Sequence, residues 1–174
     1  DRMGGKLEFD AAEFSSSELI SRISSGNCPF VAIPVFPSRT FRHGFICINR
    51  RSGIRGPKDL EGRRIGTPLY TQTAAIWLRA HLEHDYGVDL SGVTWVQGAL
   101  SLTGAHGDPS ALPPVRAARV EINASGKSLS QLLEEGGIDA TLGSNIPEAL
   151  GRNPDVQRLF PNFHEIERDY FRRT

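Results

Sequence analysis

The chain has 174 residues, and its 20 lysines and arginines balance 20 aspartates and glutamates, so its formal net charge is zero. This balance excludes a nucleic-acid-binding protein that is held by bulk positive charge. Hydrophobic residues make up 39% of the chain and charged residues 23%, which is typical of a folded domain and excludes a disordered tail. Apolar runs stay far shorter than the roughly 18 residues of a membrane span, so we expect no membrane insertion.

The first third of the chain predicts three strands and one helix. Apolar and β-branched residues place the strands at 7–14, 30–36 and 45–49, the second of them buried. Ser15 and Glu18 have the spacing of a capping box, so the helix is expected to begin at Ser16. Cys28 and Cys47 each border an apolar strand, and we expect two buried free thiols rather than a disulfide.

The middle of the chain predicts a βαβ crossover. Short runs predict a helical turn at 57–62 and strands at 64–66 and 93–96. An apolar stripe that includes Leu78 and Leu82 predicts a helix over residues 71–86, which Gly87 ends. Two strands joined by one helix in this way are expected to be parallel. Residues 99–118 show no periodicity and receive no assignment.

The last third of the chain continues the alternation of strands and helices. It predicts strands at 119–122 and 138–142, helices at 129–134 and from Pro147 onward, an apolar run at 156–160 and a final helix around 165–172. This alternation is typical of the α/β class. The sequence patterns of nucleotide-binding loops, of HEXXH zinc proteases and of the hydrolase nucleophile elbow are absent, so we expect no nucleotide cofactor and no serine-hydrolase triad.

Three polar residues of the predicted middle helix are candidates for a metal site. His81, His84 and Asp85 share one helix face by their three- and four-residue spacing. A solvated polar face opposite the apolar stripe explains the same residues, and we prefer this interpretation. The sequence therefore predicts neither a metal ion nor a cofactor.

Two short polar segments indicate a small anionic ligand: the helix start Thr71, Gln72 and Thr73, and the turn Arg39, Arg42 and His43. At a helix start, unpaired backbone N–H groups and the helix dipole favour an anion, although simple capping by Thr71 is an alternative. The turn gathers three side chains that can carry positive charge, although a solvated loop explains it equally well. We expect the helix start and the turn to face each other across the ligand.

Sequence blocks in a fixed order run along almost the whole chain. They are FVAIPVFPSR at 30–39 with Phe41-Arg42-His43, RSGI at 51–54, PKDLEG at 57–62, GTPLYTQTAA at 66–75, DYGV at 85–88, VTWV at 93–96, GIDA at 137–140 and RLFP at 158–161. Together they resemble the family of 4,5-dihydroxyphthalate decarboxylases and its relatives. Several blocks in one order make this resemblance more specific than any single block.

The resemblance implies the type 2 periplasmic-binding-protein fold, in which two α/β lobes enclose a ligand cleft. Family members are longer than this chain, so we expect a central fragment of that fold. Residues 1–50 with 147–174 would form an incomplete first lobe, and residues 51–146 the second. Whether the chain forms a homo-oligomer is left open.

The resemblance also implies a set of ligand-side residues. It places Glu13, Ser15, Ser16 and Ser17 on one lobe, Arg39, Arg42 and His43 near the hinge side, and Thr71, Gln72 and Thr73 on the other lobe. The implied partner is a small aromatic or anionic molecule. Leu19 stands where we expect a tyrosine in many relatives, which leaves the exact substrate open.

The expected function is decarboxylation of a dihydroxylated aromatic carboxylic acid by a cytoplasmic carboxy-lyase of aromatic acid degradation. Such a reaction needs a proton donor, and His43 is a candidate because the usual pKa of histidine lies near 6.5. Glu13 would serve if burial raised its pKa. The alternative is a non-catalytic, periplasmic solute-binding protein that delivers a small anion to a transporter.

Overall fold

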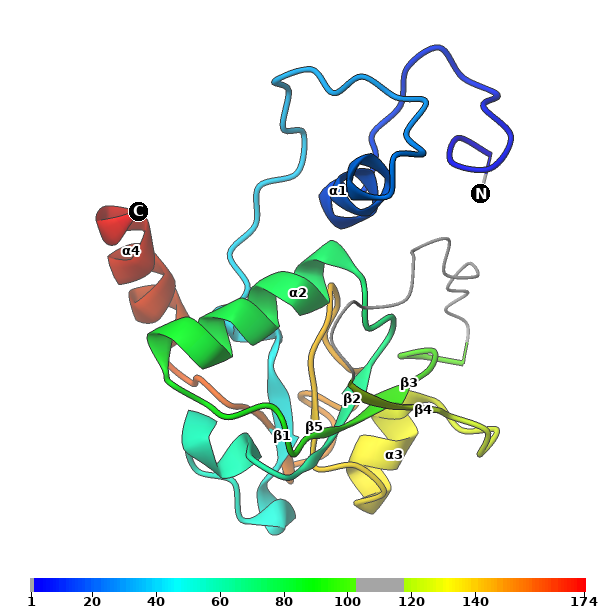
Figure 1. Cartoon of the computed structure of the whole chain (residues 1–174). Coiled ribbons are helices and arrows are strands. Elements are labelled where there is room, and N and C mark those ends of the chain that lie inside the picture. Colours follow the sequence, from blue (N-terminus) through cyan, green and yellow to red (C-terminus); the bar gives the residue numbers. More distant parts are fainter. Residues whose placement is uncertain (1, 103–117) are drawn as a thin grey trace.

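The computed structural model describes residues 2–102 and 118–174, which build one mixed sheet with helices on both faces (Figure 1). The strands are β1 (Cys47–Asn49), β2 (Arg64–Thr67), β3 (Thr94–Gln97), β4 (Arg119–Ile122), β5 (Ala140–Thr141) and β6 (Val156–Arg158), in the order β4-β3-β2-β5-β1-β6. Strands β4, β3, β2 and β5 are parallel, and β1 is antiparallel to both β5 and β6. The predicted α/β class is confirmed.

The helices are α1 (Ser16–Ser24), α2 (Thr73–Ala80), α3 (Leu129–Glu135) and α4 (Phe163–Arg173), with short turns η1 (His43–Phe45), η2 (Arg50–Ser52), η3 (Pro57–Leu60) and the π-helical turn η4 (His81–Asp85). Side chains alternate between the two faces of a strand. On β3, Trp95 packs with Leu78 of α2, whereas Val96 packs with Leu133 of α3. Helices α2 and α3 therefore cover opposite faces of the sheet.

The βαβ crossover is confirmed. Ile65 of β2 pairs with Trp95 of β3 in a parallel ladder. Helix α2 begins within two residues of the predicted start, continues into η4 and is followed by Gly87, whose φ of 63° suits glycine. None of the described helices combines the length and the apolar character needed to cross a membrane.

Two predicted strands, at 7–14 and 30–36, are wrong. Neither segment pairs with the sheet, and Val31, Ile33 and Phe36 are 91%, 69% and 70% exposed. A strand needs a neighbour to satisfy its backbone hydrogen bonds, and Pro34 removes one of the donors. Within this segment Phe30 packs on the Phe14 ring at 4.9 Å, while Val31, Ile33 and Phe36 stay largely exposed.

The helix predicted to open at Pro147 is also wrong. The Leu150 N–H donates to the Pro147 carbonyl at 3.1 Å, and the Arg152 and Asn153 N–H groups donate to the Ala149 carbonyl at 3.0 and 2.9 Å, so the segment forms successive turns and no helix. Gly151 follows with a φ of +85°, a left-handed value that ends helical structure.

The sheet crosses the boundaries that we predicted between two lobes. Strands β1 and β6, assigned to the first lobe, pair with each other, and β1 also pairs with β5 of the second lobe. Boundaries at residues 50 and 147 therefore do not coincide with the limits of the sheet, and the division into lobes stays a prediction. Of the unassigned segment 99–118, residues 103–117 lie outside the described part of the chain.

Both cysteines are free thiols, as predicted. Cys47 is fully buried, and its burial raises the pKa of the thiol to about 12. Cys28 is only half-buried, and its thiol points to the Phe30 carbonyl at 3.7 Å.

Candidate functional site

The carboxyl ends of the parallel strands β2, β3 and β5 share one edge of the sheet. Strand β2 ends at Thr67 and β5 at Thr141, and both hydroxyl oxygens are buried with no hydrogen-bond partner among the described residues. Ligands of open α/β sheets bind outside the carboxyl ends of the strands. This edge is therefore the expected place for a ligand.

The loop between β2 and α2 lines the same edge. Gln72 is the N-cap residue of α2, and its side-chain amide donates to the hydroxyl of Ser144, 3.2 Å away in the loop after β5. The Thr71 hydroxyl oxygen and the Gln72 amide oxygen are buried and have no partner within residues 2–102 and 118–174. A buried polar atom without a partner costs about 1–3 kcal/mol, so a ligand that bonds to these atoms would recover that energy.

Hydroxyl groups join the start of α1 to the start of α2. Thr73 Oγ1 lies 2.9 Å from Ser15 Oγ and 3.1 Å from Ser17 Oγ. It also accepts a hydrogen bond from the Ser17 N–H at 3.2 Å and lies 3.5 Å from Ser16 Oγ. The Ser17 hydroxyl donates to the Thr71 carbonyl at 2.9 Å. We call these five residues the serine-threonine cluster.

The cluster brings two helix N-termini to one place. Backbone N–H groups at both helix starts lack intrahelical partners, and the positive ends of both helix dipoles meet there. Hydroxyl groups next to such N–H groups add donors for an anion. Two of the three predicted ligand-side segments are thus in contact, while the part that each residue plays stays a prediction.

Glu13 and the arginines of the third segment make other contacts. Arg39 is exposed and donates to the Phe36 carbonyl at 3.4 Å. The Arg42 guanidinium lies 5.3 Å from the centre of the Phe45 ring, and burial lowers its pKa. Glu13 is exposed in the segment that leads directly into the serines of the cluster.

His43 lies near the other end of α2. Its side chain is 2% exposed and packs 4.7 Å from the His81 ring and 5.7 Å from the rings of Phe160 and Tyr170. His81 is eight residues beyond Thr73, about 12 Å along a helix, so the expectation that the helix start faces His43 is wrong. Burial, with the neighbouring His81, lowers the pKa of His43 to about 4.

The predicted polar face of His81, His84 and Asp85 divides in the structure. His81 is buried and its Nδ1 lies 2.9 Å from Asp85 Oδ2, whereas His84 is exposed. The prediction that these three side chains form a solvent-exposed polar face is therefore wrong for His81. His81 follows buried Leu78 by three residues, so it lies beside the apolar stripe, where the rings of His43 and Tyr170 cover it.

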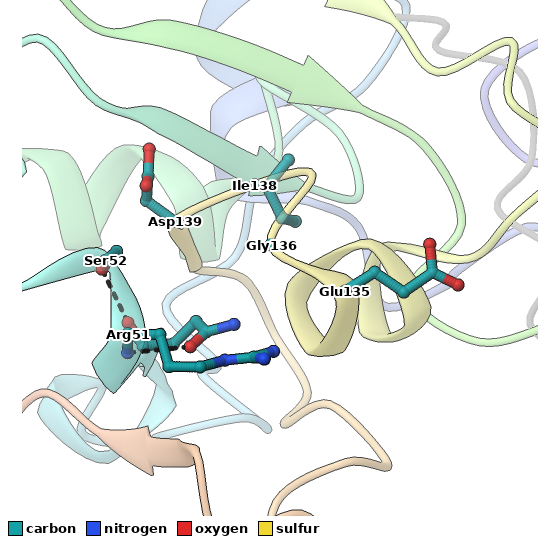
Figure 2. Close-up of a pocket in the computed structure, with 7 residues that line it drawn as sticks. Arg51, Ser52, Glu135, Gly136, Ile138 and Asp139 are labelled. Atoms are coloured by element: carbon teal, nitrogen blue, oxygen red, sulfur yellow. Dashed lines mark hydrogen bonds between the residues drawn. The ribbon is translucent and has the colours of Figure 1, made fainter.

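A hollow lies at the opposite edge of the sheet, where β2 and β5 begin (Figure 2). It is lined by Asn49, Arg51, Ser52, Glu135, Gly136, Ile138 and Asp139. The Asp139 carboxylate accepts from the Arg64 N–H at 2.9 Å, and the Arg51 guanidinium donates to the Glu134 carbonyl at 2.6 Å. These contacts hold the fold together, and the predicted site residues do not line the hollow.

Three polar residues of the carboxyl edge were not predicted: Thr67, Thr141 and Ser144. A detectable signal existed, because each stands at or just after the end of an apolar strand. Polar residues in that position of a parallel sheet are brought to a common edge.

Many ligand-binding proteins and enzymes are α/β domains with polar residues at the carboxyl ends of their strands. The fold alone therefore does not identify the family, and we compared the sequence with known proteins. No protein-family model matches the chain. It is 35% identical over 172 residues to a 4,5-dihydroxyphthalate decarboxylase of Comamonas testosteroni, a match that covers 95% of this chain and 50% of that protein. It is 36% identical over 166 residues to a 4,5-dihydroxyphthalate decarboxylase of Pseudomonas putida, covering 95% of this chain and 64% of that protein.

The similarity confirms the resemblance read from the sequence blocks: the chain is similar in sequence to two 4,5-dihydroxyphthalate decarboxylases. It spans about half to two thirds of the length of these two proteins.

Proposed function

We propose that the chain is part of a carboxy-lyase that removes carbon dioxide from a dihydroxylated aromatic acid such as 4,5-dihydroxyphthalate. The observation that carries this proposal is the serine-threonine cluster, which joins two helix N-termini at the carboxyl edge of the sheet. Such a site suits a carboxylate. The names of the two relatives supply the class of reaction.

The chemistry sets two requirements. Loss of carbon dioxide leaves an electron pair on a ring carbon, and this is avoided if that carbon is first protonated while a para hydroxyl feeds electrons into the ring. The bond from the ring to the carboxylate then breaks, carbon dioxide leaves, and the electron pair of that bond restores the aromatic ring. The enzyme must therefore hold the acidic groups and place one proton donor.

The carboxyl edge supplies donors and acceptors for a hydroxylated acid. The unpartnered Thr71 hydroxyl and the N–H groups at the helix starts can donate to a carboxylate. The unpartnered Gln72 amide oxygen can accept from a ring hydroxyl. In this proposal Arg39 holds the second carboxylate, whereas Arg42 stays beside the buried His43 near the far end of α2.

Glu13 is the better placed of the two predicted proton donors. It lies in the segment that leads into Ser15, which contacts Thr73. His43 is buried near the far end of α2, and a pKa of about 4 leaves it uncharged near pH 7. We therefore assign the proton first to Glu13, whose exposed carboxyl would have to be buried by the bound acid, and second to His43.

The proposal includes the larger architecture that the family resemblance implied. The chain would be a central piece of a cytoplasmic, two-lobed protein of the type 2 periplasmic-binding-protein fold. The ligand would lie in the cleft between the lobes, against the serine-threonine cluster. Support comes from the cluster itself, because it joins a residue set that was assigned to one lobe with a set that was assigned to the other.

The test is to incubate the full-length protein with 4,5-dihydroxyphthalate and to follow the release of carbon dioxide. Thr73→Val should raise KM about 10- to 100-fold, because it removes a hydrogen-bonding group from an anion site. Ser24→Ala, at the exposed far end of α1, is the matched control and should leave KM unchanged. Glu13→Gln should lower kcat with little change in KM.

One observation favours the alternative function, a solute-binding protein for a small anion. The edge residues Ser15, Ser17, Thr71, Gln72 and Thr73 offer hydroxyl and amide groups, which bind an anion without exchanging a proton near pH 7. Binding of the acid by the wild-type protein with no release of carbon dioxide would establish this alternative, and with it a periplasmic location becomes the better expectation.

A further inference from the structure

A second group of polar side chains lies away from the serine-threonine cluster, where η1 meets η4. His43, His81 and Asp85 each offer one ligand atom, and these atoms all lie within 4.8 Å of one another. His81 Nδ1 and Asp85 Oδ2 are 2.9 Å apart. Two imidazoles and one carboxylate are a common ligand set for zinc and similar ions.

His43 precedes His81 by 38 positions in the sequence, and the fold brings the two side chains together. Its neighbour Gly44 packs against Phe163 of α4 so closely that a Cβ on Gly44 would lie 2.5 Å from the Phe163 ring. The Gly44 N–H donates to Glu167 at 3.2 Å, and its carbonyl accepts from Arg158. The backbone of η1 is thereby tied to α4 and to β6.

His43 also carries an unmet hydrogen-bonding demand. It is 2% exposed, and neither of its ring nitrogens has a hydrogen-bond partner among the described residues. Buried polar atoms in native proteins are almost always partnered, by protein, water or an ion. The ring is surrounded by His81, Tyr86, Phe160 and Tyr170, so a bound ion is a partner that fits its position next to a second imidazole and a carboxylate.

We propose that His43, His81 and Asp85 form a binding site for one divalent transition-metal ion of the zinc class. Three protein ligands leave one position of a tetrahedral ion open for water or a small ligand. Asp85 is at the surface, so an ion can reach the two buried imidazoles from its side. The exposed Arg173 guanidinium lies 4.0 Å from Asp85 and would have to move aside for the ion.

This site does not depend on the proposed decarboxylation. The test is to strip the purified protein with a chelator and to titrate it with Zn²⁺ by calorimetry and with Co²⁺ by visible absorption. We expect one ion per chain and the ligand-field spectrum of a four-coordinate cobalt ion. Asp85→Asn removes the carboxylate but keeps the size and shape of this exposed side chain. It should weaken Zn²⁺ binding about 100-fold or more, which exceeds the loss usual for a residue that only hydrogen-bonds to a metal ligand.

His84→Ala is the matched control, since His84 lies in the same turn, is exposed and is outside the group. It should bind Zn²⁺ as the wild type does. His43→Leu should abolish binding, and circular dichroism must show that this variant is folded. Absence of one-to-one binding in the wild type, equal binding by Asp85→Asn, or loss of binding in His84→Ala would each overturn the proposal.

Discussion

The attachment of α1 to α2 depends on the Thr73 hydroxyl, and Thr73→Val removes it with little change of shape. None of the residues of α1 is fully buried, and Ile20 and Ile23 on this helix are 64% and 58% exposed. Packing therefore contributes little to holding α1 in place. The hydrogen bonds that converge on Thr73, with the bond from the Ser17 hydroxyl to the Thr71 carbonyl, connect α1 to α2.

The size of the effect follows from these contacts. Thr73 Oγ1 accepts from the Ser17 N–H and contacts the hydroxyls of Ser15 and Ser17. Each hydrogen bond is worth about 0.5–1.5 kcal/mol net, and partial exposure places these near the lower end. Because Ser15 Oγ and Ser17 Oγ lie 3.1 Å apart and can still bond each other in the variant, the net loss is about two of the three hydrogen bonds. This gives about 1–2 kcal/mol, a factor of about 5 to 30 in the equilibrium for detaching α1.

Amide hydrogen exchange measured by mass spectrometry tests this value. Peptides that cover Ser16–Ser24 should exchange about 5 to 30 times faster in Thr73→Val than in the wild type, while α3 peptides stay unchanged. Ser24→Ala removes a bond within α1 to the Ser21 carbonyl and should not reproduce the effect. If α1 exchanges at the wild-type rate in Thr73→Val, or if Thr73→Val unfolds the whole protein, then other contacts hold α1.

Three further predictions concern the core. Leu78→Ala should lower the free energy of unfolding by about 2–5 kcal/mol in urea denaturation, because Leu78 is fully buried between α2 and the sheet; a loss under about 1 kcal/mol would contradict this. Gly66→Ala should cost about 1–3 kcal/mol by the same measurement, since its Cβ would lie 2.6 Å from Ile138 Cδ1. At pH 8 a thiol reagent should label Cys28 in the folded protein and both cysteines in denaturant, because burial raises the pKa of Cys47 to about 12; equal labelling of both in the folded state would show that Cys47 is accessible.

The core of the fold could be predicted because its signals are local. At the start of α3 the Ser128 hydroxyl accepts from the Gln131 N–H, and the Gln131 side chain accepts from the Ser128 N–H. At its end Gly136 adopts a left-handed conformation. Residues next to each other in the sequence therefore determine both ends of this helix. The apolar period of α2 and its stop at Gly87 are equally local. Elements that are specified in this way were found within a few residues.

The failures share one cause, which is dependence on distant parts of the chain. Residues 30–36 have the composition of a buried strand, yet a strand exists only if another segment pairs with it. The grouping of His43 with His81 and Asp85 joins residues from two separate turns, and helical spacing instead suggested His84. Spacing predicts neighbours within one element, but contacts between elements come from the fold.

The continuous sheet constrains how this protein can move. Because β1 and β6 are hydrogen-bonded into the same sheet as β2 and β5, residues 47–49 and 156–158 belong to one rigid body with the crossover. A hinge cannot lie between residues 50 and 51 without breaking this ladder. Any swing of α1 relative to the sheet must instead be taken up by rotation of backbone dihedrals in residues 25–42, which lack regular structure. Opening would therefore separate Ser15 and Ser17 from Thr73 while leaving Gln72 and Ser144 in place.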